Sequence, residues 1–343
     1  MKQRITIRDV AKYSGVSSAT VSYVLNGVDK VSTETKERVL DAIKKLNYQP
    51  DFTAISLSKK KSSILGVMIP LIGGSLSPLF KEDHYYTEFI SGFEHVCREN
   101  GYDLLISGIE NPEDCKNWVK KRNLDGLVFL GLFPKSLYEE MKTLQIPIVL
   151  IDIYGEYEKH FNSIKIADEL GGYLATKHLT ELGHRQIAFV GPPQKQSPVV
   201  SERYQGYKKA LKEANIPLDK CSTFECDGNM ESGYQIGEKI LQSGKVFTGI
   251  VSNSDILAVG IISALQKNGI KVPENVSIVG FDDLAFSKYV SPALTTINQD
   301  ILQKGEIAGQ ILIDAIENSS AKMEHVTMPV KLVRRDSTET LRK

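Results

Sequence analysis

From Ser63 onward, short apolar runs alternate with helix-like segments along most of the chain. The apolar runs cover residues 64–69, 104–109, 126–130, 148–151, 187–190, 249–251 and 276–280. Helical patterns lie near residues 86–100, 136–144, 168–182, 202–214, 231–242, 255–268 and 300–317. Apolar strands separated by helices are typical of parallel sheets with both faces covered. A break near residues 152–162 divides the strands into two sets, so the sequence predicts an α/β body of two lobes with a ligand cleft between them.

The N-terminal residues carry the signals of three short helices. Thr6 followed by Asp9 resembles a capping box, because the hydroxyl can accept from the Asp9 amide and the carboxylate favours the positive helix end. Gly15 suits the positive φ that ends a helix, Ser17 can cap a second helix reaching residue 26, and a third follows Ser32. Three short helices joined by a tight turn predict a helix-turn-helix, with an unrelated small helical bundle as the alternative.

Charge is distributed unevenly along the sequence. The whole chain of 343 residues has 42 basic and 42 acidic side chains, but residues 1–61 hold twelve Lys or Arg against six Asp or Glu. The N-terminal segment therefore carries a net charge of +6 and the remainder −6. This asymmetry indicates that the N-terminal segment meets a polyanion, whereas the bland alternative is a solvated charged surface.

Several classes of protein are disfavoured by what the sequence lacks. No apolar run approaches the roughly 18 residues of a membrane span, and the N-terminus has no apolar stretch of a secretory signal, which argues against an exported transport-type binding protein. The four cysteines form no C-x-x-C pair and the six histidines have no metal-ligand spacing. Dinucleotide, phosphate-loop and G-x-S-x-G motifs are absent, so we expect a cytoplasmic non-enzyme without cofactor or metal.

The sequence resembles the lactose-repressor (LacI) family of regulators over nearly its whole length. At the N-terminus the resemblance rests on residues 6–22, 24–26, 31–32 and 46–50. In the body it rests on residues 177–191, 203–207, 254–260, 276–283 and 291–297. It implies a DNA-binding transcriptional regulator, most simply a repressor, with a body similar to a periplasmic sugar-binding protein.

The resemblance also implies domain boundaries. Residues 1–49 would form the DNA-binding headpiece, residues 50–61 a hinge helix, and residues 62–343 the effector-binding and dimerisation body. The chain would cross between the lobes near residues 161, 291 and 321. The first lobe would then hold residues 62–161 and 291–321, and the second lobe residues 162–290 and 322–343.

In the family, the second helix reads DNA bases in the major groove. By position Ser18, Ala19 and Tyr23 would reach base edges, whereas Thr20 and Ser22 would contact phosphates. Tyr23 departs from the usual arginine, which can bind guanine through two hydrogen bonds, so we expect an atypical operator. The complete expected set of DNA-binding residues, including the hinge, is Thr6, Ser17, Ser18, Ala19, Thr20, Ser22, Tyr23, Asn26, Ala54 and Leu57.

The hinge residues have their own implied roles. Leu57 would insert into the minor groove as an apolar wedge, and Ala54 would face the partner hinge or the groove. Each headpiece reads half a site, so we expect a homodimer on a roughly palindromic operator. The chain lacks a terminal heptad run, which disfavours a tetramer.

Candidate effector contacts also follow from the resemblance. Arg203 suits a hydroxyl pair, carboxylate or phosphate, and Asp282 can accept from two vicinal hydroxyls, which favours a sugar or sugar derivative. The expected set is Arg203, Asp282, Asp152, Ser254, Asn253, Tyr86 and Phe281, with core packing as the alternative for Phe281. A purine or phosphosugar corepressor, or a partner protein, remains the alternative effector. The long loop at residues 73–86 either borders the cleft or is a surface insertion.

Overall fold

The structure is a computed structural model that describes residues 5–25, 27–49, 61–71, 84–109, 111–318 and 322–341. The chain divides into two compact units, Met1–Ser63 and Ile64–Lys343, and each is described by itself. No helix among the described residues is long and apolar enough to cross a membrane.

The first unit contains the three helices that the sequence predicts, α1 (Ile7–Ser14), α2 (Ser18–Leu25) and α3 (Thr33–Leu46). Asp9 accepts hydrogen bonds from the backbone N–H of Thr6 at 2.8 Å and from its hydroxyl at 2.7 Å. Gly15 ends α1 with a φ of 68°, and the Ser17 hydroxyl accepts from the Thr20 amide at the start of α2. The helices enclose a small core of Val10, Ala11, Val21, Val24, Val39 and Ala42.

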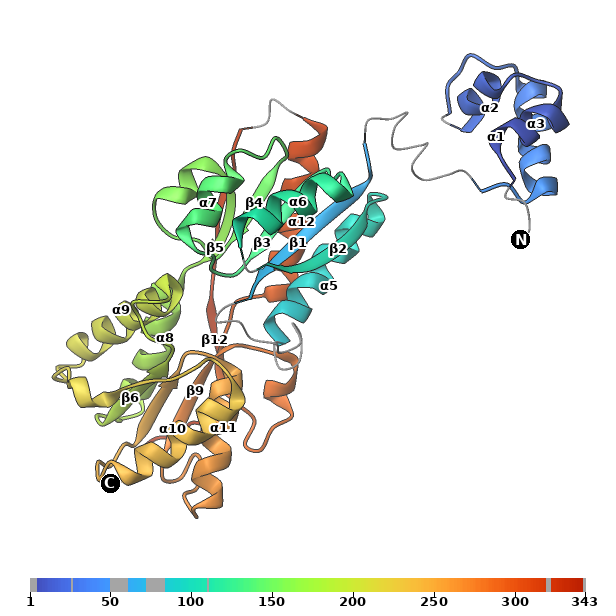
Figure 1. Ribbon diagram of the computed structural model, residues 1–343. Helices are drawn as coiled ribbons and strands as arrows, with labels where there is room; N and C mark the ends of the chain where they lie inside the picture. Colours follow the sequence, from blue (N-terminus) through green and yellow to red (C-terminus); the bar gives the residue numbers. More distant parts are fainter. Residues whose placement is uncertain are drawn as a thin grey trace. The chain divides into compact units, whose positions relative to one another are not determined.

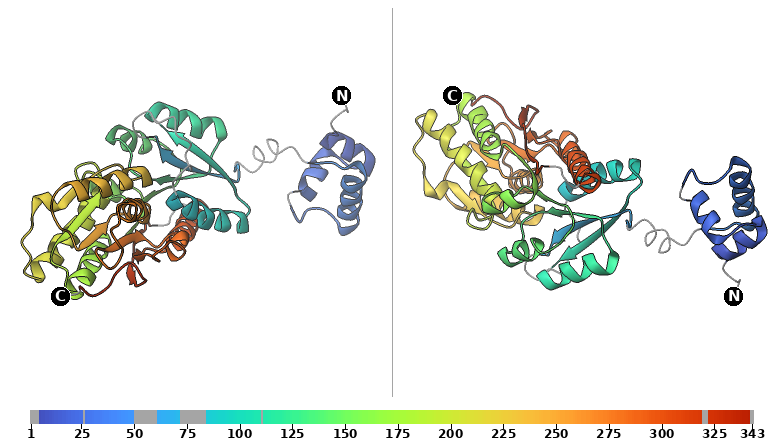
Figure 2. Two further views of the ribbon diagram at one scale, coloured as in Figure 1. Left: turned by 90° about the horizontal axis from the view of Figure 1, so that it is seen from below. Right: turned by 90° about the horizontal axis from the view of Figure 1, so that it is seen from above.

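The second unit is built on two six-stranded sheets (Figure 1). The first sheet has the order β11-β5-β4-β3-β1-β2 and is parallel throughout. Its strands are β1 (Ile64–Pro70), β2 (Asp103–Ile109), β3 (Gly126–Leu130), β4 (Ile148–Ile151), β5 (Asn162–Ile166) and β11 (His325–Met328). Helices α5 (His84–Glu99) and α12 (Ile301–Glu317) pack together on one face, as Figures 1 and 2 show, and α6 (Pro112–Arg122) and α7 (Lys135–Met141) pack on the other.

The second sheet has the order β12-β10-β9-β8-β6-β7, and only β12 among its paired strands is antiparallel to its neighbour. Its strands are β6 (Ile187–Gly191), β7 (Thr223–Glu225), β8 (Gly249–Ser252), β9 (Ser277–Asp282), β10 (Thr295–Asn298) and β12 (Lys331–Val333). It is covered by α8 (Asp168–Glu181), α9 (Pro198–Glu213), α10 (Met230–Gln242) and α11 (Asp255–Lys267). Short 3₁₀ helices lie at Glu156–His160, Lys220–Ser222 and Ala285–Lys288.

Alternate strand residues enter different cores, which explains the continuous apolar runs. In β1, Val67 packs with Phe89 of α5, whereas its neighbour Met68 packs with Cys115 of α6. In β8, Val251 and Ile250 are divided between two cores in the same way. Because both faces of these strands are buried, most of their residues are apolar, and the expectation of covered parallel sheets is confirmed.

The lobe boundaries differ from those expected. Strands β5 and β11 belong to the first sheet and β10 to the second, so the chain crosses between the lobes at residues 167, 299–300 and 329–330. Crossings near 161, 291 and 321 were therefore placed too early, because the short strands at 162–166, 295–298 and 325–328 have no apolar run of their own to mark them. The first lobe thus ends with Ile166 rather than residue 161.

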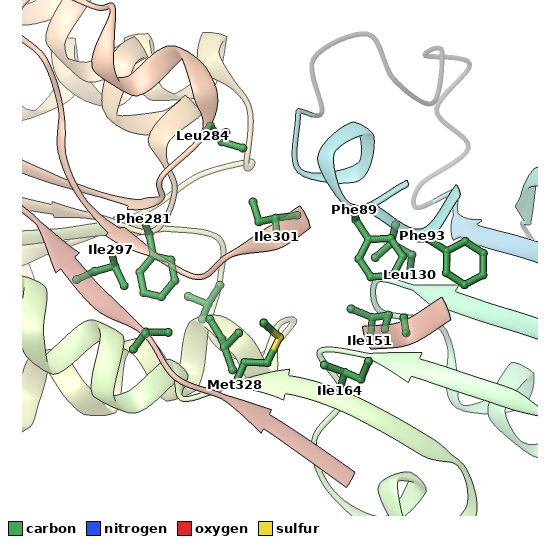
Figure 3. Close-up of a cluster of buried hydrophobic side chains, with 14 of the residues drawn as sticks. Phe89, Phe93, Leu130, Ile151, Ile164, Phe281, Leu284, Ile297, Ile301 and Met328 are labelled. Carbon is green, nitrogen blue, oxygen red and sulfur yellow. The ribbon is translucent and has the colours of Figure 1, made fainter. Parts of the chain in front are cut away.

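One apolar core continues through the crossings from lobe to lobe (Figure 3). Phe281, Leu284 and Ile297 lie on the second-lobe side, and Phe89 and Leu130 on the first-lobe side. Ile301 and Met328, which flank the second and third crossings, lie between them in the picture. The two lobes therefore share a buried apolar contact beside the strand ends.

Candidate functional site

Polar side chains gather at the carboxyl ends of the parallel strands in both lobes. Asp152 directly follows β4, Asn253 follows β8, and Asp282 is the last residue of β9. The crossings after β5, β10 and β11 start from these same edges, so the carboxyl edges of both sheets lie beside the crossings. In open α/β sheets this edge is where ligands bind.

Arg203 of α9 lies at the centre of the second-lobe cluster and is 6% exposed. Its Nε donates to Asp168 Oδ1 at 2.7 Å, and its Nη1 donates to the Asn253 carbonyl at 2.6 Å and lies 3.9 Å from Asp282 Oδ1. Gly172 of α8 permits this position, because a Cβ there would lie 1.9 Å from the Arg203 carbonyl oxygen. The guanidinium is thus held by two hydrogen bonds and an ion pair.

In this cluster, burial and the neighbouring charges shift the pKa of each ionisable group in opposite directions. Burial raises the pKa of Asp282 well above its ordinary value and also raises that of Asp168, while the Arg203 guanidinium pulls both back. For Arg203 itself, burial lowers the pKa, but the carboxylates of Asp168 and Asp282 outweigh it and the net pKa is raised. Arg203 therefore stays charged, and its charge compensates the neighbouring carboxylates.

A second cluster lies in the first lobe around Lys304 of α12, whose side chain is completely buried. Its Nζ donates to both oxygens of Asp152, at 2.9 and 3.1 Å, to the Tyr85 hydroxyl at 3.2 Å and to Gln299 Oε1 at 2.7 Å. The Tyr85 hydroxyl also donates to Asp152. The amide of Gln299 in turn donates to Asp282 Oδ1 at 2.6 Å, so the two clusters are connected.

The remaining expected effector residues take different positions. Asn253 is 9% exposed, and its Oδ1 has no hydrogen-bond partner in the structure. Ser254 caps α11 by accepting from the Leu257 amide. Tyr86 is half-buried, with its hydroxyl near Gly131 at the end of β3. Phe281 is only 1% exposed because Arg203 covers its ring, so it supports Arg203 rather than offering a wall to a ligand in this arrangement.

In the headpiece, one face of α2 is open to solvent. Val21 and Val24 are buried, whereas Ala19 and Tyr23, four residues apart on one helix face, are exposed. Ser18, Thr20 and Ser22 are half-buried, and the hydroxyls of Ser17 and Thr20 lie 2.9 Å apart. Thr6 takes part in the start of α1 as described above. The expected contacts of Asn26, Ala54 and Leu57, and most of the 73–86 loop, lie outside the described residues.

Several residues of the site were missed by the sequence interpretation, namely Tyr85, Tyr154, Asp168, Gln299 and Lys304. The Tyr154 hydroxyl donates to Asp168 Oδ2, which joins the first lobe to the Arg203 cluster. Lys304 left a signal, because it interrupts the apolar helix face formed by Ile301, Ala308 and Ile311. A lysine at such a position needs buried partners.

Two parts of the sequence match known families. Residues 6–51 match the lacI family of bacterial regulatory proteins, and residues 176–338 match the periplasmic binding protein-like domain. The HTH-type transcriptional repressor PurR of Histophilus somni (strain 129Pt) is 34% identical over 98% of this chain and 99% of its own length. PurR of Actinobacillus pleuropneumoniae serotype 3 (strain JL03) is 35% identical with the same coverage.

Solved structures agree with these matches. The lac repressor dimer bound to operator and the anti-inducer ONPF superposes with a TM-score of 0.85 and 30% identity, covering 98% of this chain and all of that one. A complex of the transcriptional regulator CelR with cellobiose gives a TM-score of 0.73 and 27% identity, with 97% and 100% coverage. A LacI family regulator from Enterococcus faecium with bound ribose gives 0.71 and 26%, with 81% and 100% coverage.

A helix-turn-helix headpiece and a two-lobed body of parallel sheets define the class as that of transcriptional regulators built on a periplasmic-binding-protein-like body. The chain belongs to the lacI family, and it is a DNA-binding transcriptional repressor.

Proposed function

We propose that a neutral, polyhydroxylated small molecule, such as a sugar, controls the operator affinity of this repressor by binding at the carboxyl edges around Arg203 and Asp282. The observation that carries this proposal is the unpaired side-chain Oδ1 of Asn253, a residue whose backbone carbonyl accepts from Arg203. A buried carbonyl oxygen without a donor is unfavourable, and a ligand hydroxyl would satisfy it. Asp282 and the side chain of Asn253 would then accept hydrogen bonds from ligand hydroxyls, while Arg203 would donate hydrogen bonds to the ligand.

Charge balance favours a neutral ligand over a phosphosugar. The two buried cations of the site, Arg203 and Lys304, already contact three carboxylates, those of Asp152, Asp168 and Asp282. A phosphate would have to displace one of these carboxylates and leave it buried without a partner, which is costly. A planar purine would need an exposed ring to stack on, and Phe281 is covered by Arg203.

The comparisons support the same ligand class, since CelR and the Enterococcus faecium regulator have structures with cellobiose and ribose. They also support a homodimer, because the lac repressor binds its operator as a dimer. In this proposal Ser18, Ala19 and Tyr23 read bases, Thr20 and Ser22 contact phosphates, and Leu57 with Ala54 acts in the hinge. Thr6, Ser17 and Asn26 complete the DNA-contacting set.

Control requires that the ligand binds the operator-competent and incompetent states with different affinity. The coupling is reciprocal, so operator DNA changes the affinity for the sugar by the same factor. We propose release from DNA, with the ligand acting as inducer, and a cytoplasmic location for the regulator.

A thermal-shift screen of the full chain tests the ligand class, using panels of neutral sugars, phosphosugars and purines. We expect a neutral sugar to raise the melting temperature and N253A to abolish that shift. N253A removes the unpaired oxygen but keeps the backbone carbonyl that holds Arg203, so the ligand-free protein should melt as the wild type does. K245A, a change on the exposed surface of the second lobe, serves as the control. A shift with phosphosugars alone, or one that survives N253A, would overturn the proposal.

A further inference from the structure

Gln299 forms a buried polar bridge between the lobes and is 1% exposed. It belongs to the second crossing, between β10 of the second sheet and α12 of the first lobe. Its amide nitrogen donates to Asp282 Oδ1 in the second lobe at 2.6 Å, and its amide oxygen accepts from Lys304 Nζ in the first lobe at 2.7 Å. One side chain thus contacts the charged cluster of each lobe.

Lys304 serves this bridge and has no capacity left for a ligand. An ammonium group has three N–H donors, and those of Lys304 are directed at Asp152, Tyr85 and Gln299. Its side chain is completely buried, so a ligand could reach it only after these bonds break. Lys304 is therefore a positioning residue for Gln299 and Asp152.

Two other described polar contacts join the lobes, because the Tyr154 hydroxyl donates to Asp168 at the start of α8 and a weaker bond lies near the surface. Glu88 of α5 accepts from the Ala285 amide at 3.2 Å near the surface. Water can replace the Glu88 bond when the lobes move, whereas Gln299 is 1% exposed and lies in the chain between Ile297 and Ile301, two residues of the apolar core in Figure 3. Separation of the lobes would break at least one of the two Gln299 hydrogen bonds and leave a buried polar group without that partner.

From these contacts we infer that Gln299, positioned by Lys304, is a buried polar link that holds the two lobes in the observed arrangement. An effector that takes Asp282 Oδ1 competes with the Gln299 amide and so loosens the first lobe from the second. This last step rests on the proposed effector site. The holding role of Gln299 does not depend on it.

Interlobe distances measured by pulsed electron spin resonance test the link without any ligand. Nitroxide labels are placed at K121C on α6 and K212C on α9, both exposed, in the full chain with Cys221 and Cys226 replaced by serine and diluted with unlabelled protein. We expect one dominant distance in this background. Q299L should raise the population of a second distance several-fold above its level in the background. Q303L, the same change at an exposed site on α12, should leave the distribution unchanged.

Two further variants test whether misfolding causes the change in the distance distribution of Q299L. Q299E can still accept from Lys304 but loses the amide N–H that donates to Asp282, so it should add the second distance in a protein that melts cooperatively. K304M/D152N removes both charges together and should behave in the same way. Identical distributions for Q299L, Q299E and the background, or an equal change in Q303L, would overturn the inference. A failed sugar screen would leave these distances unaffected, so the two proposals fail separately.

Discussion

The guanidinium carbon of Arg203 lies 3.5 Å from the centre of the Phe281 ring. The ring is 1% exposed, and its edge packs on Gly171 of α8, where an added Cβ would lie 2.6 Å from the ring. Phe281 is therefore a platform that fixes the plane of the guanidinium. A cation over an aromatic ring out of water gains about 2 kcal/mol.

We predict that F281L lowers the free energy of unfolding by about 2 kcal/mol more than F247L does. Phe247 is a buried aromatic of the same lobe, 4% exposed, that packs against Phe224 rather than a cation. Urea unfolding of the full chain measures both variants. Equal losses of unfolding free energy in F281L and F247L would show that the Arg203 cation adds no stability through the Phe281 ring.

The crossing of α8 and α9 sets the depth of Arg203. A Cβ at Gly172 would lie 1.9 Å from the Arg203 carbonyl oxygen, so G172A must separate the two helices. Overpacking of this kind costs about 1–3 kcal/mol. We predict that G172A destabilises the protein by this amount and weakens any ligand-induced thermal shift, because Arg203 moves away from Asp282.

The matched control for G172A is G228A. A Cβ at Gly228 meets only Pro192, at 3.8 Å, which is an ordinary contact. The melting temperature and the ligand-induced shift of G228A should match those of the wild type. A full shift in G172A would mean that the helix crossing does not control the Arg203 position.

The sequence predicted most of the covered parallel strands because strands such as β1, buried on both faces, are apolar at successive residues, as Val67 and Met68 show. It did not predict β5 or β10, because buried polar residues interrupt them. Ser163 of β5 bonds to His325, and Thr296 of β10 bonds to Asp255. Such residues are satisfied by partners distant in the sequence, and no local pattern reveals those partners. The first two misplaced crossings follow directly from these two strands, and the third follows from β11, which has no apolar run either.

The sequence predicted only some residues of the candidate site, again because local patterns do not reveal partners that are distant in the sequence. Asp152 and Asp282 stand at strand ends, which local apolarity locates, so their convergence could be expected. Arg203 came from the family resemblance. The partners Asp168, Gln299 and Lys304 depend on how the crossings bring the two lobes together, and the crossings themselves were misplaced. Local sequence patterns therefore do not reveal which buried charged residues pair with one another in the folded protein.

Asp255 leads to a prediction about pH. Its buried carboxyl accepts from the Leu284 amide and from the hydroxyls of Ser287 and Thr296. Burial outweighs these donors and raises the pKa of Asp255 from 3.8 to about 7. The folded state therefore binds a proton that the unfolded state releases, and this stabilisation is present below the unfolded pKa and lost as the pH rises through about 7.

D255N should remove this dependence. Between about pH 4 and pH 7, the free energy of unfolding of the wild type should fall relative to that of D255N, by at most about 1.4 kcal/mol per pH unit. Urea titrations at a series of pH values measure the difference, and D103N, at an exposed carboxyl at the start of β2, is the control. Parallel curves for the wild type and D255N would show that Asp255 does not titrate in this range.

Tyr23 leads to a prediction about operator choice. It is 43% exposed, and it lies one helical turn after the exposed Ala19, so the two side chains share the open face of α2. A tyrosine hydroxyl there can make a single hydrogen bond to a base edge, where an arginine would make two. We predict that Y23A weakens binding to an operator selected from random DNA by about 1–3 kcal/mol, roughly five- to 150-fold, and relaxes the preference at one base pair of each half-site. T20A should instead weaken binding equally for all sequences, since phosphate contacts carry no base information.

Y13A removes an exposed tyrosine from α1 and is the matched control for Y23A. Titration of selected and point-substituted operators by fluorescence anisotropy measures all three variants. A uniform loss in Y23A, with every base preference intact, would place Tyr23 among the phosphate contacts and leave the atypical operator unexplained.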